Sequence, residues 1–325
     1  MSSVEKFQSL IILAAVFTGL ALGQVAGVAR QAGHFILPFL LVMLLGVFLH
    51  VPLRRIAGAF RHGRVTGLSL VINFIWNPIF AWLLGWLFLR DQPALWLGLI
   101  LLMVTPCTDW YLVFTGVARG NVALGTALLP WNLLLQLILL PVYLLLLAGT
   151  LAPLPWQLLV ESVVVVLLFP LLSAVALRRL IIRLKGNAWL EQVLLPGVQS
   201  GQILFLGLAI TAMFASEGAV LLASPLVFLN LLPPILLFFG VNFGLIYLLA
   251  RFFRLSYRDY AAFCCTTLAR NSPIALAIAL VAFPERPLIA LALIIGPLIE
   301  LPVLSVVAQL LLRIQRGGWL DASGA

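Results

Sequence analysis

The sequence has few charged residues, few histidines and few cysteines. Only 9% of its 325 residues are charged and 64% are hydrophobic, whereas a soluble domain carries roughly 25% charged residues. Three histidines and three cysteines, two of them adjacent at Cys264 and Cys265, give no metal-ligand spacing and no disulfide framework. So few polar groups could not cover a water-exposed surface. The composition therefore argues against a soluble enzyme, a nucleic-acid-binding protein and a secreted disulfide scaffold.

Long hydrophobic runs occupy most of the chain. A membrane-spanning helix needs about 20 mostly apolar residues, and ten stretches meet that requirement. The expected spans are Phe7–Val28, Phe35–Leu53, Thr66–Leu89, Ala94–Ala118, Asn121–Leu147, Trp156–Leu177, Gln192–Phe214, Pro225–Ala250, Asp259–Phe283 and Pro287–Leu312. The first also has features of a signal peptide, but its apolar run is too long for one, so we expect a retained span. The sequence predicts an all-α integral membrane protein with ten transmembrane helices.

The basic residues alternate with these spans. Fifteen of the 19 Lys and Arg residues fall on one side of a ten-span topology, three fall on the other, and Arg270 lies inside the ninth span. Cytoplasmic loops carry the excess of Lys and Arg. We therefore expect a multi-pass protein of the cytoplasmic membrane with both termini in the cytoplasm. Its basic loops are expected to face anionic lipid head groups and not nucleic acid.

Five spans per half would place the second half upside down relative to the first, as in transporters with inverted repeats. Prolines recur at offsets of 156 to 161 residues: Pro38 with Pro196, Pro78 with Pro234, and Pro141 with Pro302. Proline is also common in membrane helices in general. On this basis we expect a single transporter domain of residues 1–325, with one repeat over about 1–149 and the other over about 150–325.

Three charged residues lie deep inside the expected spans, whereas Glu161 and Asp259 lie near span ends. Asp109 follows Pro106 in the fourth span, Arg270 precedes Pro273 in the ninth, and Glu300 lies in the tenth. Charged side chains in the bilayer are costly and are usually functional, and proline interrupts the helix that contains it. We expect the fourth and ninth helices to be discontinuous and to cross at the midplane. Asp109 and Arg270 are expected to form a pair there.

Two pairs of amides share one helical face each, because their members are four residues apart. They are Asn73 with Asn77 in the third span and Asn132 with Gln136 in the fifth. Each pair fits two interpretations, the lining of a cavity and hydrogen bonding between helices.

The motifs of the interrupted spans resemble those of the bile acid/arsenite transporter superfamily, and within it the arsenical-resistance arsenite permeases. They are Pro106-Cys107-Thr108, Asn271-Ser272 with Leu276-Ala277-Ile278-Ala279 following, and Glu300. The resemblance covers essentially the whole chain. It implies two inverted five-helix repeats, crossing helices 4 and 9, a panel of helices 1, 2, 6 and 7, and a core of helices 3–5 and 8–10. It also implies that Cys107 and Glu300 act in transport.

The function that this resemblance implies is secondary active efflux of arsenite, or of antimonite or another arsenic species, in exchange for protons. The expected substrate-binding residues are Cys107, Glu300, Asn271, Ser272 and Thr108, and the expected coupling residues are Glu300, Asp109 and Arg270. No cofactor, metal or catalytic residue is expected. The chain departs from typical relatives because no acidic residue follows the break in the ninth span. A cation at that break disfavours a nearby sodium ion and would suit an anionic substrate.

Two other functions compete with this one. The first is an ion-coupled symporter of a small organic anion, either bile-acid-like or a carboxylate, with Arg270 binding the carboxylate. The second is an intramembrane enzyme. It is disfavoured because the three histidines, at positions 34, 50 and 62, lie near span ends or in loops, and no nucleophile–base pair is evident.

Overall fold

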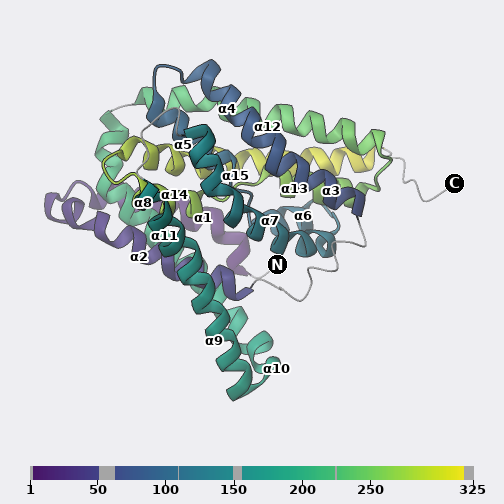
Figure 1. The fold of residues 1–325 in the computed structure, drawn as a ribbon, viewed down its shortest axis with the longest axis horizontal. Helices are drawn as coiled ribbons and strands as arrows, with labels where there is room; N and C mark the ends of the chain where they lie inside the picture. Colours follow the sequence, from purple (N-terminus) through teal and green to yellow (C-terminus); the bar gives the residue numbers. More distant parts are fainter. Residues whose placement is uncertain (1–2, 51–62, 109, 149–155, 224, 318–325) are drawn as a thin grey trace. The chain divides into compact units, whose positions relative to one another are not determined.

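The computed structural model describes residues 3–50, 63–108, 110–148, 156–223 and 225–317, and every regular element there is a helix (Figure 1). The chain forms two compact units. The first contains the described parts of residues 1–51, 155–228 and 273–294, and the second contains those of residues 52–154, 229–272 and 295–325. Each unit therefore combines segments from both halves of the sequence.

The first unit is built around a long helix. Its elements are α1 (Ser3–Leu22), α2 (Ala26–His50), α8 (Trp156–Val163), the π-turn η4 (Val164–Leu168), α9 (Phe169–Lys185), α10 (Asn187–Trp189), the π-turn η5 (Leu190–Leu194), α11 (Leu195–Ala223) and most of α14 (Ser272–Ala282). Helix α11 packs along α1 and α2 (Figure 1). Two glycines show how closely α11 approaches α1 and the residue that follows it. A Cβ atom at Gly19 would lie 2.6 Å from the Thr211 carbonyl oxygen, and one at Gly23 would lie 2.8 Å from the Ala215 carbonyl oxygen. Small residues spaced in this way let membrane helices approach closely.

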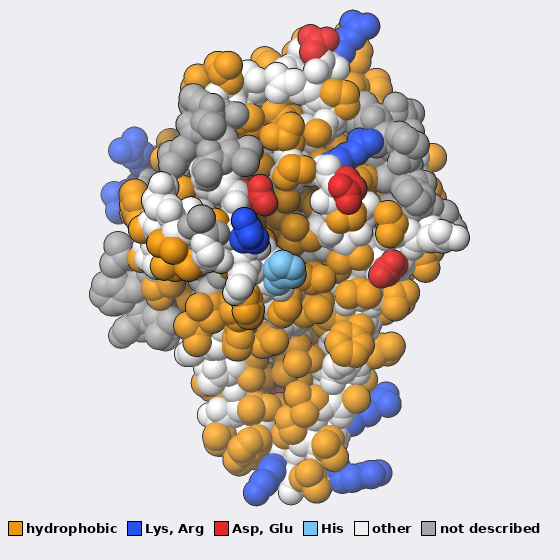
Figure 2. Space-filling model, turned by 90° about the vertical axis from the view of Figure 1, so that its left-hand side faces the viewer, with side chains coloured by type: hydrophobic (Ala, Val, Ile, Leu, Met, Phe, Trp, Pro, Cys, Tyr) orange, Lys and Arg blue, Asp and Glu red, His pale blue; other side chains and the backbone are white. Residues whose placement is uncertain are grey.

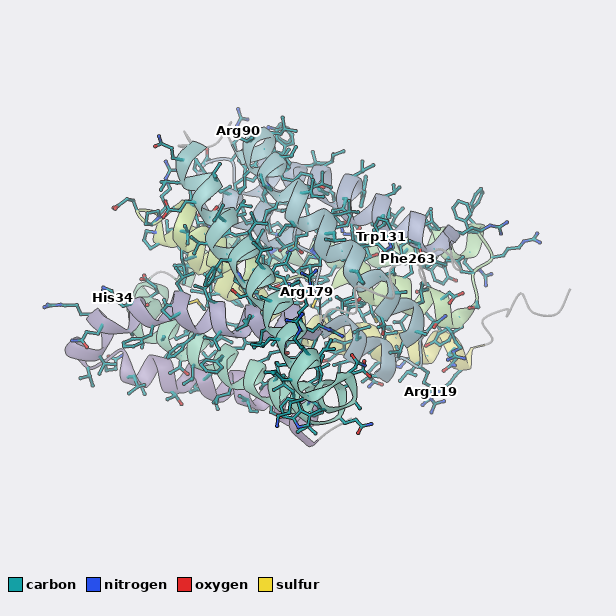
Figure 3. All side chains as sticks on the ribbon, turned by 60° about the horizontal axis from the view of Figure 1, so that its bottom comes forward. His34, Arg90, Arg119, Trp131, Arg179 and Phe263 are labelled. Carbon is teal, nitrogen blue, oxygen red and sulfur yellow. The ribbon has the colours of Figure 1, made fainter. Side chains whose placement is uncertain are left out.

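The second unit holds two of the charged positions that the sequence singles out, Arg270 and Glu300. Its elements are α3 (Gly63–Val71), the π-turn η2 (Ile72–Trp76), α4 (Asn77–Phe88), α5 (Pro93–Met103), α6 (Trp110–Val117), α7 (Val122–Tyr143), the π-turn η3 (Leu144–Ala148), most of α12 (Pro225–Phe252), α13 (Tyr257–Leu268) and the greater part of α15 (Pro287–Arg316). Arg90, between α4 and α5, and Arg119, between α6 and α7, lie at opposite edges of the drawing (Figure 3).

Local sequence explains where several of these helices begin. Proline occupies the first turn of α5, where its missing N–H is not needed. In α4 and α9 a proline is instead the second residue after the π-turns η2 and η4. The side-chain oxygen of Asn121 accepts a hydrogen bond from the Leu124 N–H, and the Ser256 hydroxyl accepts one from the Asp259 N–H. These two residues thereby satisfy N–H groups at the start of α7 and α13.

Seven helices in the described part of the chain are long and apolar enough to cross a membrane by length and composition. They are Gly27–His50, Gly63–Phe88, Val122–Leu147, Val160–Lys185, Asn187–Gly218, Leu226–Phe252 and Pro287–Arg316. Shorter apolar helices are Leu13–Leu22, Pro93–Met103 and Ser272–Ala282. On the face shown in Figure 2, hydrophobic side chains cover most of the lower part. The Lys and Arg side chains of that lower part lie at its edges. The structure thus agrees with the expectation of an all-helical membrane protein.

Some expected span ends differ from the observed helix ends. The first span was expected to reach Val28, but α1 ends at Leu22 and Val28 lies in α2, because the chain turns over Gly23–Val25. The sixth span was expected to end at Leu177, but α9 continues to Lys185. The residues after Leu177 are mostly good helix formers, so the helix outlasts the apolar run. It ends at Gly186, whose φ of 85° few other residues adopt easily.

Candidate functional site

The first interruption separates α5 from α6. Helix α5 closes at Met103, and the Val104 N–H makes a 2.9 Å bond to the Ile100 carbonyl oxygen. Pro106 cannot donate a backbone hydrogen bond and so cannot continue the helix. Helical structure resumes at Trp110. The sequence predicted this break from Pro106.

The second interruption separates α13 from α14. Helix α13 closes at Leu268, with the Ala269 N–H bonded at 3.1 Å to the Cys265 carbonyl oxygen. Ala269, Arg270 and Asn271 are not helical, and α14 begins at Ser272. Pro273 favours this arrangement, because proline suits the first turn of a helix, where its missing N–H is not needed. The segment expected to form the ninth span therefore consists of two separate helices, α13 and α14, as predicted.

The two interruptions pair with each other. Pro106 and Arg270 form an isolated antiparallel bridge. The Cys107 N–H donates to the Ala269 carbonyl oxygen at 3.0 Å, and the Asn271 N–H donates to the Thr105 carbonyl oxygen at 2.7 Å. Backbone groups that leave a helix inside an apolar environment must find such partners. Here each interruption supplies the partners of the other.

Side chains reinforce this bridge. The Asn271 amide Nδ2 donates to the Thr108 hydroxyl at 3.1 Å, and the Thr105 hydroxyl lies 3.3 Å from the Asn271 carbonyl oxygen. Cys107 is 1% exposed and its thiol is not part of a disulfide. The structure thus brings Cys107, Thr108 and Asn271 to one place, although they are 163 or more residues apart across the bridge.

Glu300 reaches the same bridge from α15. Its Oε1 accepts a 2.8 Å hydrogen bond from the backbone N–H of Arg270, and the side chain is 5% exposed. The close approach depends on Gly296, one turn earlier. A Cβ atom at Gly296 would lie 2.8 Å from the methyl carbons of Leu102 and 3.1 Å from the Ser272 hydroxyl. Ser272 is 3% exposed, and among the residues described here its hydroxyl has no hydrogen-bond partner.

Arg270 is 2% exposed, and its guanidinium is surrounded by oxygen atoms. Nη1 donates to the Met103 carbonyl oxygen at 2.8 Å, and Nη2 donates to Asn73 Oδ1 at 2.9 Å. Nη2 also donates to the Thr267 carbonyl oxygen, and Nε donates to that of Leu268 at 3.3 Å. The described residues therefore supply four acceptors to this one head group.

The expected pairing of Arg270 with Asp109 has no structural test, because Asp109 lies outside the described residues. It stays a prediction. In the part of the chain that is described, no three His, Cys, Asp or Glu residues gather as a possible metal site.

Two neighbours of Arg270 are not among the residues that the sequence predicts for the site. The four-residue spacing of Asn73 from Asn77 could have indicated a site residue, but it fits hydrogen bonding between helices equally well. In the structure Asn73 lies in the π-turn η2, and Asn77 Nδ2 donates to its Oδ1 at 3.3 Å. No feature of the sequence indicates Phe238 as a site residue, because it is one aromatic residue in an apolar run. The Arg270 Cζ atom lies 5.4 Å from its ring centroid.

The segments described above are helical and include seven helices suited to crossing a membrane, so the protein is a multi-pass membrane protein. Residues 37–224, more than half of the chain, match the sodium bile acid symporter family, and the chain belongs to that family of transporters.

Three relatives match nearly the whole chain. The arsenical-resistance protein Acr3 of Corynebacterium glutamicum is 29% identical over 94% of this chain and 87% of its own length. An uncharacterized transporter of Synechocystis is 27% identical over 94% and 88%. The arsenical-resistance protein Acr3 of Alkaliphilus metalliredigens is 22% identical over 92% and 90%.

Proposed function

We propose that this protein is a secondary active transporter that exports arsenite, or antimonite or another arsenic species, across the cytoplasmic membrane in exchange for protons. The observation that carries the proposal is a buried thiol, Cys107, in a hydrogen-bonded bridge between two helix interruptions that Glu300 also reaches. The names of two relatives, both arsenical-resistance proteins, point the same way.

Cys107 suits the chemistry of arsenite. At neutral pH arsenite is a neutral trihydroxide that binds sulfur, and one thiol would hold it reversibly, whereas three would retain it. The surrounding polar groups suit its hydroxyls. Thr108, Asn271 and Ser272 are buried beside the bridge, and we assign them to the substrate site together with Cys107 and Glu300.

Glu300 suits the exchange of a proton. A buried carboxyl group inside a membrane helix is costly as a fixed charge and is usually functional. Gain and loss of its proton would link substrate movement to the proton gradient. Asp109 and Arg270 are assigned to the same coupling step, because they too are charged residues at the two interruptions.

The proposed architecture has ten spans in two inverted repeats, with both termini in the cytoplasm and crossing helices 4 and 9. Two pairs of short helices around the interruptions support this count, since α5 with α6 and α13 with α14 would each make one span. The two compact units support a division into a panel of helices 1, 2, 6 and 7 and a core of helices 3–5 and 8–10, except that residues 273–294, which include most of α14 and the start of α15, fall in the first unit.

The alternative, symport of an organic anion, would use Arg270 to bind a carboxylate. Four donor–acceptor contacts already engage its guanidinium with protein oxygens. A carboxylate would have to displace some of them and leave buried carbonyls without partners, which costs free energy. The geometry therefore supports the metalloid exporter better.

The test is growth of an exporter-deficient bacterial host on arsenite, antimonite and organoarsenicals. We expect the parent protein to confer resistance and Cys107→Ser to lose it, while the variant remains present in the membrane. The matched control is Cys264→Ser with Cys265→Ser, because both thiols are buried in α13 and lie outside the bridge. Equal resistance in parent, variant and control would overturn the metalloid function and favour the organic-anion symporter.

A further inference from the structure

The four acceptors that described residues offer to the Arg270 guanidinium share one property, which is that none of them carries a formal charge. Three are backbone carbonyl oxygens, of Met103, Thr267 and Leu268, and the fourth is the amide oxygen of Asn73. The Glu300 carboxylate lies beside them, and its Oε1 accepts from the backbone N–H of Arg270. In the described part of the chain, the positively charged head group is therefore hydrogen-bonded to uncharged oxygens, with a carboxylate close by.

The helix crossing explains why these carbonyls are available. In an uninterrupted helix the Met103 carbonyl would accept from the Cys107 N–H, and the Thr267 carbonyl would accept from the Asn271 N–H. The bridge diverts both N–H groups, to Ala269 and to Thr105. The Met103 and Thr267 carbonyls therefore lack their usual helical donors. They lie at the C-terminal ends of α5 and α13, where the helix dipole adds negative partial charge.

Such a set of oxygens is a cation site by its chemistry. Carbonyl and amide oxygens are the ligands of hard cations, and carbonyls at the C-terminal ends of half-helices coordinate sodium in membrane transporters. The side chain of Asn77 offers one more oxygen. Asn77 is fully buried, and within the described segments its Oδ1 has no hydrogen-bond partner, although its Nδ2 bonds to Asn73. The face of Phe238 favours a cation as well.

We propose that Arg270 is a tethered cation, whose guanidinium permanently fills a site that would otherwise take a small monovalent cation from solution. Truncation of the side chain would take a donor away from three backbone carbonyl oxygens and from Asn73 Oδ1, which also accepts from Asn77 Nδ2. It would open the site to sodium or to free guanidinium. The consequence for transport rests on the proposed function: a cation fixed to the chain would make export independent of sodium.

The test measures thermal unfolding of the purified protein in detergent, without substrate. Arg270→Ala and the parent are compared in choline chloride, sodium chloride and low concentrations of guanidinium chloride at equal ionic strength. In choline we expect Arg270→Ala to unfold at a lower temperature than the parent. Sodium or guanidinium should raise that temperature saturably, by about 2–4 °C or more, because a ligand of the folded state alone stabilises it.

The parent should show no such response to sodium, because its site is filled. The matched control is Arg313→Ala, which removes an exposed arginine from α15 and should respond to no cation. The same unfolding temperature of Arg270→Ala in all three salts would overturn the proposal, and so would a saturable response of the parent to sodium.

A second pair of variants decides the matter if Arg270→Ala does not fold. Arg270→Lys and Arg270→Met have side chains of similar length and differ in charge. The ammonium group can stay among the oxygens, so the Lys variant should give more folded protein and should not respond to sodium. Equal folded yields of the two would overturn the proposal. Because no arsenic species is present, failure here is distinct from failure of the growth test.

Discussion

Glu300 is held by a contact that does not need its charge. Its Oε1 accepts the Arg270 N–H at 2.8 Å, and the amide oxygen of glutamine can accept the same bond. Glu300→Gln should therefore fold and bind substrate while losing the exchangeable proton. In everted vesicles we expect uptake driven by an imposed proton gradient to fall to background. Substrate binding by the purified variant should stay within about threefold of the parent, because the amide oxygen of glutamine can replace the carboxylate oxygen as a hydrogen-bond acceptor.

The parent protein provides the control for this experiment. Uptake that follows a sodium gradient instead of a proton gradient would contradict the assignment of Glu300. Full proton-driven uptake by Glu300→Gln would contradict it equally.

Individual residues of the site differed in how far the sequence could predict them. Pro106 and Pro273 marked both interruptions, because proline has a fixed local effect in any helix. Arg270 stood out because charge is rare in membrane helices. Its contacts with Met103 and Thr267 were not predictable, because they are made to backbone carbonyls that become available only when the two interruptions pair. That pairing depends on distant segments of the chain.

At the scale of elements, the contact between α1 and α11 depends on the absence of side chains at Gly19 and Gly23. A methyl group at either position would lie within 2.8 Å of a carbonyl oxygen of α11. Gly19→Ala and Gly23→Ala should each lower the free energy of unfolding by about 1–3 kcal/mol, since overpacking forces the helices apart. The measurement is thermal unfolding in detergent.

Gly27→Ala is the matched control for these two variants. Gly27 lies near the start of α2, and a Cβ atom there would meet nothing within 4 Å. Alanine at that position should leave stability unchanged or raise it slightly, because alanine favours helix more than glycine does. A loss at Gly27 as large as that at Gly19 would show that the close packing is not the cause.

Asn121 joins the start of α7 to that of α13. Its Oδ1 accepts the Leu124 N–H at 3.1 Å, and its Nδ2 donates to Asp259 Oδ1 at 2.8 Å. Asn121→Ala should cost about 1–2 kcal/mol, because it removes a helix cap together with a bond to a carboxylate. The expected readout is a lower unfolding temperature. Asn187→Ala, which removes an exposed bond to Glu191, is the control and should change little.

Element boundaries were harder to predict than the elements themselves. Apolar length predicted the helices that contain Thr66–Leu89 and Pro225–Ala250 almost to their ends, because a membrane helix must satisfy its backbone internally. It could not predict that α9 continues to Lys185. Beyond the apolar run, the end of a helix depends on local propensity and on a stop such as Gly186.

At the scale of the whole molecule, each compact unit draws on both halves of the sequence. The proline offsets predicted that the halves correspond, but such offsets contain no information about which helices pack together. Packing inside a membrane depends on close approach, as at Gly19 and at Gly296, and single glycines in an apolar run give little warning of it. The units are therefore a finding of the structure, whereas the membrane spans follow from composition.

The orientation of the molecule in the membrane can be tested with two exposed arginines. Arg90 lies in a turn expected outside the cell, and Arg179, on α9, lies in a segment expected in the cytoplasm (Figure 3). The three native cysteines are buried, so a thiol reagent that cannot cross membranes should report mainly on an introduced cysteine. In intact cells we expect Arg90→Cys to be labelled and Arg179→Cys to be protected until the membrane is opened. The physical reason is the excess of Lys and Arg on the cytoplasmic side.

Two outcomes would contradict this orientation. Labelling of Arg179→Cys alone in intact cells would mean that the topology is the reverse of the one expected. Labelling of both variants would mean that an even number of spans separates the two positions.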